Sequence, residues 1–249
     1  MYDITTIIIV AGTFLIAGTV KGVIGFGLPL VSLGLLTLTI NLPEAMSLLL
    51  VPSFVTNFWQ AISGGNGKII LRRLWLFLIS ASITVWIGVS ALRYIELELI
   101  SAVLGTLIVI YSSISLIGLR PTLSPRQEFW LGPIAGWING LLAGMTGSFV
   151  VPGVIFLQAI KLPRNMLNQA MGMLFTLSTI ALASALERNN FLTPELGILS
   201  TAALLPAAIG MFTGQLIKEK MSEQMFLRLF FTSLLSLGAY IIANSLNSL

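Results

Sequence analysis

The stretch GTVKGVIGFGLP at positions 18–29 decides how this chain can fold. Three glycines, Gly22, Gly25 and Gly27, fall within six residues, and Pro29 follows them. Glycine costs backbone entropy in a helix and proline lacks an N–H, so one continuous helix is hard to hold here. Because apolar residues flank the stretch on both sides, we expect a helix that breaks within a membrane and restarts near Phe26–Pro29.

The composition is that of an integral membrane protein. Only 9% of the 249 residues are charged and 56% are hydrophobic, with a mean hydropathy of +0.99. Soluble globular domains carry about 25% charged residues. The composition therefore excludes a soluble enzyme. The net charge of +4 is small, and we interpret it as a signal of membrane topology rather than of nucleic-acid binding.

The chain contains no Cys and no His. Disulfides, thiolate nucleophiles, Cys/His metal sites and imidazole acid–base catalysis are therefore excluded. The carboxylates lie at segment edges, so we expect a protein that is not an enzyme and has no cofactor or metal. A membrane-embedded enzyme acting on lipids stays a remote alternative, because it would need acid, base or metal ligands deep in the membrane.

Six apolar segments each have the length of one membrane-spanning helix. A span needs about 20 mostly apolar residues, and a chain without an alternating strand pattern crosses lipid as helices. The sequence therefore predicts an all-α polytopic membrane protein. The six segments are 44–63, 71–92, 97–119, 166–187, 194–217 and 224–246.

Two further regions, 4–40 and 129–160, share a different plan. Each has an apolar run, a glycine-rich break and a second run that is too short to span comfortably. The breaks contain Gly22–Pro29 in the first region and Gly140, Gly144 and Gly147 in the second. We expect half-helices here, and the sequence leaves open whether each region crosses the membrane or re-enters it.

The positive residues predict the orientation of the chain. With the loop at Lys68 placed in the cytoplasm, ten of the twelve Lys and Arg residues other than Lys21 fall on that side. They are Lys68, Arg72, Arg73, Arg120, Arg126, Lys161, Arg164, Lys218, Lys220 and Arg228. Arg93 and Arg188 fall outside. Both termini are then predicted outside, in a multi-pass protein of a bacterial inner membrane.

The two halves of the chain, 1–122 and 123–249, match each other. At an offset of 122, Gly18, Gly22 and Gly25 align with Gly140, Gly144 and Gly147. Leu42-Pro43 later aligns with Leu162-Pro163. Each half has about five helical segments, an odd number of crossings, so the second half would be inverted, as in many secondary transporters. The alternative is chance recurrence in a chain with 23 glycines.

Both breaks favour an anion site. A broken helix at membrane depth must line a cavity, and a restarting helix points its positive N-terminus at it. Lys21 would add a cation, although it could instead extend its side chain to the membrane surface. The amides of Asn57 and Gln60, deep in an apolar segment, are further candidates. Asn139, Gln158, Asn168 and Gln169 are weaker, since such groups often only join helices. The candidate substrate-binding residues are Lys21, Gly22, Gly25, Phe26, Gly27, Pro29, Asn57, Gln60, Gly144, Thr146, Gly147 and Ser148.

The chain resembles the TauE/SafE sulfite exporter family, also called the TSUP family. The residues that carry the resemblance are GTVKGVIGFG at 18–27 with Pro29-Leu30, Leu42-Pro43-Glu44-Ala45, Asn57 and GLLAGMTG at 140–147. It departs from the family pattern after GFG and after Thr146-Gly147. The resemblance implies transport of small sulfur-containing anions, such as sulfite, sulfoacetate and related sulfonates, by alternating access.

The expected partners are a small anionic substrate and the lipid bilayer, without nucleic acid. Export is favoured because an anion leaving a negative-inside cell gains about 2.3 kcal/mol per charge per 100 mV. A cation-coupled importer of a related anion is the main alternative, and a non-transporting scaffold is a further one. The oligomeric state, the particular sulfur anion and any ion coupling are left open.

Overall fold

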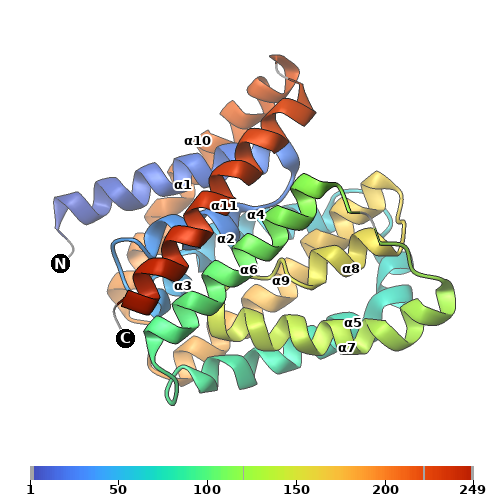
Figure 1. The fold of residues 1–249 in the computed structure, drawn as a ribbon, viewed down its shortest axis with the longest axis horizontal. Coiled ribbons are helices and arrows are strands. Elements are labelled where there is room, and N and C mark those ends of the chain that lie inside the picture. The colour runs from blue at the N-terminus through green and yellow to red at the C-terminus, as the bar shows by residue number, and fades with distance from the viewer. Residues whose placement is uncertain (1–2, 120, 221, 248–249) are drawn as a thin grey trace. The chain divides into compact units, whose positions relative to one another are not determined.

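The structure is a computed structural model that describes residues 3–119, 121–220 and 222–247, and within them every regular element is an α-helix (Figure 1). The predicted all-α class is confirmed. Arg120, which belongs to the predicted cytoplasmic charges, lies outside the described residues. The helices are α1 Ile4–Ile24, α2 Leu28–Leu36, α3 Leu42–Leu48, α4 Leu50–Ile62, α5 Gly67–Ala91, α6 Leu97–Ile117, α7 Pro125–Thr146, α8 Gly153–Ala159, α9 Arg164–Arg188, α10 Pro194–Lys220 and α11 Glu223–Asn247.

Among the described residues, six helices are long and apolar enough to cross a membrane, with mean hydropathies of 1.5 to 2.2: α1, α5, α6, α9, α10 and α11. The bent pair α3 and α4 together would make a seventh crossing. The outer face of α5 is apolar. Its residues Ile79, Ile83 and Ile87 recur every four residues and are each about half exposed. Such a stripe is unfavourable in water and favourable in hydrocarbon, so the fold is that of a polytopic membrane protein.

The glycine-rich breaks are narrower than the sequence predicts. α1 continues through Gly22 to Ile24, and α2 begins at Leu28, which confirms the expected restart. In the second half, α7 continues through Gly140 and Gly144 to Thr146. The short α8 then begins only at Gly153. Single glycines in a helix cost about 1 kcal/mol each, a cost that close helix packing can offset.

The sequence predicts one helix over 44–63, and this prediction is wrong, because α3 ends at Leu48 and α4 begins at Leu50. The chain bends by 45° between α3 and α4. Pro52 has no N–H to donate to the carbonyl of Leu48, so the helical ladder is interrupted. Ser200 of α10 replaces the missing bonds: its Oγ donates to Leu48 O at 2.8 Å and accepts from Val51 N at 3.1 Å. A side chain from another helix therefore satisfies the broken backbone.

The chain forms two compact units, and each draws helices from both predicted halves. Unit 1 comprises Met1–Pro52, Ile95–Leu119 and Asn190–Leu249, and unit 2 comprises Ser53–Tyr94 and Arg120–Asn189. In unit 1 the main helix pairs are α1 with α10 and α6 with α11; in unit 2, α5 packs against α7 and α9 (Figure 1). The predicted halves 1–122 and 123–249 do not coincide with these compact units, and the repeat stays a prediction.

Gly18 and Gly22 bring α1 into direct contact with α10. A Cβ added at Gly18 would overlap the carbonyl oxygen of Ala207, and one added at Gly22 would overlap that of Met211. Gly22 also faces the Cα of Gly214 at 3.0 Å from the added atom. These contacts account for both glycines by helix packing, and a direct role of Gly22 in substrate binding stays a prediction.

Gly140 and Gly144 make the same contacts between α7 and α5. A Cβ added at Gly140 would overlap the carbonyl oxygen of Ala81, and one at Gly144 that of Val85. The partners on α10, Ala207 and Met211, follow those on α5, Ala81 and Val85, at one constant interval of 126 residues. This shared register is what the predicted repeat would produce; its inverted orientation stays a prediction.

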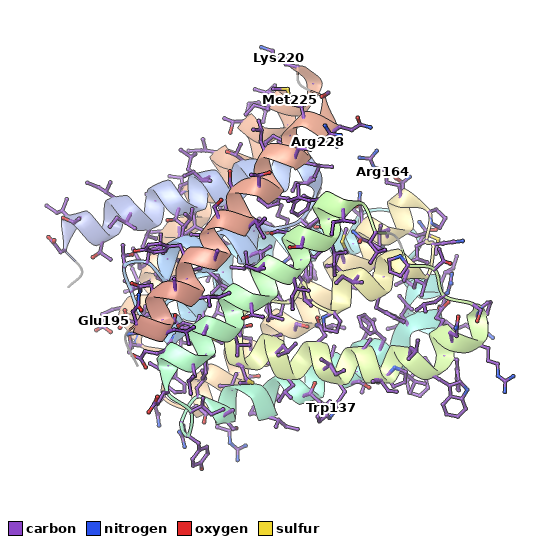
Figure 2. The ribbon with its side chains drawn as sticks, in the orientation of Figure 1. Trp137, Arg164, Glu195, Lys220, Met225 and Arg228 are labelled. Atoms are coloured by element: carbon purple, nitrogen blue, oxygen red, sulfur yellow. The ribbon has the colours of Figure 1, made fainter. Side chains whose placement is uncertain are left out.

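The positive residues of the α10–α11 pair, Lys218, Lys220 and Arg228, lie toward one end of the pair in unit 1 (Figure 2). Figure 2 shows Lys220 and Arg228 near one end and Glu195 at the opposite end. Lys218 and Lys220 lie in the last turn of α10, and Glu195 lies in its first turn. This arrangement agrees with the positive-inside pattern, while the side of each end stays a prediction.

Replacing Gly144 by Ala should destabilise the α5–α7 pair. The added methyl group would overlap backbone atoms, and overpacking of this kind costs about 1–3 kcal/mol. Thermal unfolding of the purified protein in one detergent measures the effect. Gly12→Ala is the matched control, because an added Cβ there meets nothing within 4 Å and should leave the melting temperature unchanged or slightly raised. Equal melting temperatures for the two variants would contradict close packing at Gly144.

Candidate anion-binding site

The first break turns the chain between α1 and α2. Gly25 follows the last residue of α1 with a φ of 90°, and its N–H donates to Lys21 O at 2.7 Å. Gly27 has a φ of 97°. Positive φ values of this size are strained for any residue with a Cβ, so the two glycines are the residues that permit the turn.

The N-terminus of α2 is buried, and no described side chain caps it. Its first backbone hydrogen bond runs from Val31 N to Gly27 O at 2.9 Å, so the N–H groups of Leu28 and Leu30 have no partner within the helix. Leu28 and Leu30 are fully buried, and Pro29 between them has no N–H to satisfy. The start of α2 is therefore a desolvated positive helix end, the arrangement expected for binding an anion.

Lys21 lies in the last turn of α1 and is only 3% exposed. A side chain extended toward the membrane surface would be exposed, so burial argues against that alternative. Phe26 is also buried, and its ring lies 6.3 Å from that of Tyr111, which in turn lies 5.5 Å from Phe231. Phe26 therefore belongs to an aromatic cluster of unit 1 that fixes the break in place.

The second break begins at Gly147, which has a φ of 73° and donates its N–H to Ala143 O at 2.7 Å. The hydroxyl of Thr146 donates to Leu142 O at 2.7 Å and accepts from Ser148 N at 3.3 Å. Thr146 is thus committed to the turn itself. The hydroxyl of Ser148 is buried and has no hydrogen-bond partner among the described residues.

Asn139 joins α7 to the start of α8. Its Oδ1 accepts the N–H of Gly153 at 2.9 Å, and a Cβ added at Gly153 would lie 2.5 Å from the same oxygen. The Nδ2 group of Asn139 is buried without a hydrogen-bond partner in the described part of the chain. The sequence places Asn139 among the weaker candidates. Its position directly before Gly140 gives no sign that the fold brings it to Gly153, fourteen residues later.

The two breaks differ in whether a side chain caps the helix that follows. At the offset of 122, the residue of the first half that aligns with Asn139 is Ala17, which cannot cap a helix. The first break thus has an uncapped helix start and a buried lysine. The second has a capped helix start and two neutral buried groups, the amide of Asn139 and the hydroxyl of Ser148.

Of the two predicted amides, that of Gln60 joins two helices. Its Nε2 donates to Asn168 O at 2.8 Å, while Gln169 donates to Ala61 O at 2.8 Å and accepts from Asn66 N at 2.9 Å. These reciprocal bonds fasten α4 to α9. Asn57, one turn before Gln60, is fully buried.

The candidate residues divide between the two units. Lys21, Gly22, Gly25, Phe26, Gly27 and Pro29 belong to unit 1, and Asn57, Gln60, Gly144, Thr146, Gly147 and Ser148 belong to unit 2. Within each unit the structure brings the residues of one break together. The meeting of the two breaks near the membrane midplane stays a prediction.

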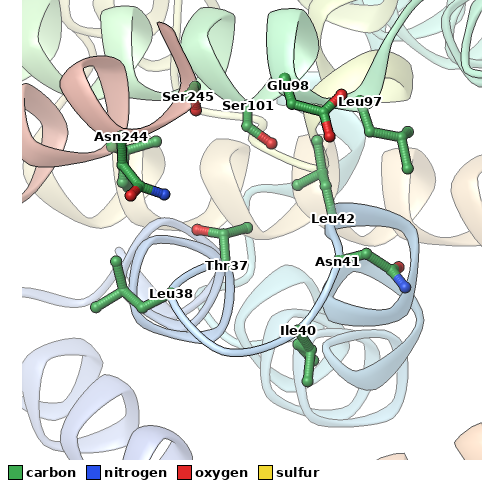
Figure 3. Close-up of a pocket in the computed structure, with 11 residues that line it drawn as sticks. Thr37, Leu38, Ile40, Asn41, Leu42, Leu97, Glu98, Ser101, Asn244 and Ser245 are labelled. Carbon is green, nitrogen blue, oxygen red and sulfur yellow. The ribbon is translucent and has the colours of Figure 1, made fainter. Parts of the chain in front are cut away.

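A separate cavity of about 200 Å³ lies in unit 1 between the end of α2, the start of α6 and the end of α11 (Figure 3). Thr37, Ser101, Asn244 and Ser245 contribute polar groups to it, and Glu98 is its charged lining residue. A carboxylate repels anions, so this cavity does not suit the expected substrate. Among the described residues, no three carboxylates gather as they would around a metal ion.

Replacing Asn139 by Leu should lower the melting temperature. Leucine has a similar size but leaves the buried N–H of Gly153 without its acceptor, at a cost of about 1–3 kcal/mol. Thr201→Val serves as the control, because the exposed Thr201 hydroxyl bonds within its own helix, to Gly197 O. An Asn139→Leu protein as stable as wild type would show that the contact with Gly153 does not support the break.

A known protein family matches most of the chain. No curated protein and no solved structure matches the chain. The family model described as sulfite exporter TauE/SafE matches residues 10–241, which include both breaks and nearly the whole chain. The family is one of membrane transporters for sulfur anions. The chain is therefore a member of the TauE/SafE sulfite exporter family.

Proposed function

We propose that this protein exports small sulfur-containing anions, such as sulfite, sulfoacetate or related sulfonates, by alternating access. The observation that carries the proposal is the set of buried donors at the breaks. Asn139 and Ser148 bury polar groups without a hydrogen-bond partner among the described residues, and a buried unsatisfied group costs about 1–3 kcal/mol. A bound oxyanion would supply the missing acceptors.

The first break, in unit 1, offers positive charge. Lys21 is buried in the last turn of α1, and the uncapped start of α2 follows within seven residues, at Leu28. Cations and helix N-termini both favour an anion over a cation or a neutral solute. Backbone N–H groups at a helix start can donate hydrogen bonds to the equivalent oxygens of a small sulfite or sulfonate group.

Membrane potential supplies a driving force for this direction. Each negative charge that leaves a negative-inside cell gains about 2.3 kcal/mol per 100 mV. Export then needs no coupled ion, and the carboxylates at segment edges are consistent with this. A cation-coupled importer of a related anion is the second candidate function, and its uptake would follow an imposed proton or sodium gradient.

Replacing Lys21 by Met should weaken sulfite binding by about 10- to 100-fold, since a hydrogen bond to a charged group contributes about 1.5–3 kcal/mol. Titration of the purified protein with sulfite measures the affinity. Lys68→Met, in the exposed first turn of α5, removes the same charge elsewhere and should bind as wild type does. If the Lys21→Met protein kept wild-type affinity, Lys21 would have no part in the site.

Sulfite flux in proteoliposomes tests export itself. With equal sulfite on both sides, an imposed potential should drive net movement of sulfite toward the positive side. At zero potential, a proton or sodium gradient should drive none. Accumulation that follows either cation gradient would instead support the importer, and flux no greater than in liposomes without protein would contradict transport of this anion.

A further inference from the structure

A second cavity, in unit 2, lies at the end of the α5–α7 pair that contains Arg72. It has a volume of about 420 Å³ and is lined by α5, α7 and Phe156 of α8. Its floor is apolar: Phe77, Phe156 and Gly132 are buried, and the rings of Phe77 and Phe156 lie 4.8 Å apart. Figure 1 shows α5 and α7 side by side along their length.

Of the two arginines that line this cavity, one forms an ion pair and the other does not. Arg73 donates from Nε and Nη2 to the two carboxylate oxygens of Glu128 at 2.6 and 2.7 Å, and also contacts Ile160 O at 3.4 Å. This bidentate pair is neutral overall and fastens α5 to α7. Arg72 is exposed and has no ion-pair partner among the described residues. The cavity therefore carries one uncompensated positive charge.

The cavity also offers an acceptor. Pro133 lies inside α7 and has no N–H, so the carbonyl of Phe129 loses its usual helical partner. Phe129 and Pro133 both line the cavity. A hydroxyl on a bound headgroup could donate to this carbonyl.

The position of the cavity fits the boundary between headgroups and hydrocarbon. The exposed stripe Ile79, Ile83 and Ile87 on α5 ends toward Trp75, which is 49% exposed and lines the cavity. Tryptophan is enriched at that boundary, and positive residues beyond it face lipid headgroups. Arg72 lies one turn before Trp75, on the polar side of this boundary.

We propose that this cavity binds one anionic phospholipid, with its phosphate at Arg72 and an acyl chain over the apolar floor formed by Phe77, Gly132 and Phe156. One positive charge matches the single negative charge of a phosphodiester. The apolar floor distinguishes a lipid from a free phosphate, which would have no use for it. The site is separate from the glycine breaks and does not depend on the transported substrate.

Native mass spectrometry of the purified protein with added lipid tests the proposal. Wild type should bind phosphatidylglycerol more tightly than phosphatidylcholine of the same acyl chains. Arg72→Gln should weaken binding of phosphatidylglycerol about fivefold, since one basic residue near anionic lipid contributes about 1 kcal/mol. Arg93→Gln is the matched control, because it removes an exposed arginine that does not line the cavity.

A second variant tests the floor without changing charge. Gly132→Leu places a side chain into the cavity, where even a Cβ would lie 3.3 Å from Phe156 Cζ. It should reduce binding of both lipids in protein that still elutes as one species. Wild-type phosphatidylglycerol binding by Arg72→Gln, or an equal loss in Arg93→Gln, would overturn the proposal. Displacement of the lipid by glycerol phosphate at equal concentration would also overturn it, in favour of a small-anion site.

Discussion

Hydrocarbon offers no partner for a backbone N–H or C=O, and the described structure depends on this constraint wherever a helix is interrupted. Each interruption has a particular solution. Glycines with positive φ return the N–H of Gly25 and of Gly147 to the end of the preceding helix. Ser200 gives Leu48 O a donor in place of Pro52 and accepts from Val51 N, and Asn139 accepts the N–H of Gly153. The start of α2 differs because no described side chain caps it. Burying a helix N-terminus without hydrogen-bond acceptors costs free energy, and a bound anion would offset that cost.

The sequence predicts the membrane helices well because their length and apolar composition can be read directly from it. α5, α6, α9, α10 and α11 lie within a few residues of the predicted segments. The restart of α2 is also predictable, since Gly27 and Pro29 are local signals. The break between α3 and α4 carries a signal too, Pro52, but a proline in a membrane helix does not always bend it. Whether it does depends on a partner such as Ser200, which lies 152 residues from Leu48 in the sequence.

The site is less predictable for the same reason. Glycine spacing could not separate Gly22 and Gly144, which pack against neighbouring helices, from Gly25 and Gly147, which turn the chain. Gln60 and Asn139 look alike in the sequence as polar residues in apolar segments. The fold directs the Nε2 of Gln60, on α4, to the carbonyl of Asn168 on α9, whereas Asn139 uses only its oxygen among the described residues. Which atoms remain available to a ligand is a property of tertiary contacts, and no local pattern encodes it.

The differences between the two halves suggest a division of roles. The matched glycine contacts of α1 with α10 and of α7 with α5 are what duplication of one half of the chain would leave. The chemistry at the two breaks differs: one has a buried lysine and an open helix end, and the other has an amide and a hydroxyl. At the first break, one lysine would attract an anion without holding it as tightly as two lysines would. At the second break, neutral donors would give orientation and selectivity at little electrostatic cost. For a transporter, which must release its substrate in every cycle, this unequal arrangement is better suited than a symmetric one.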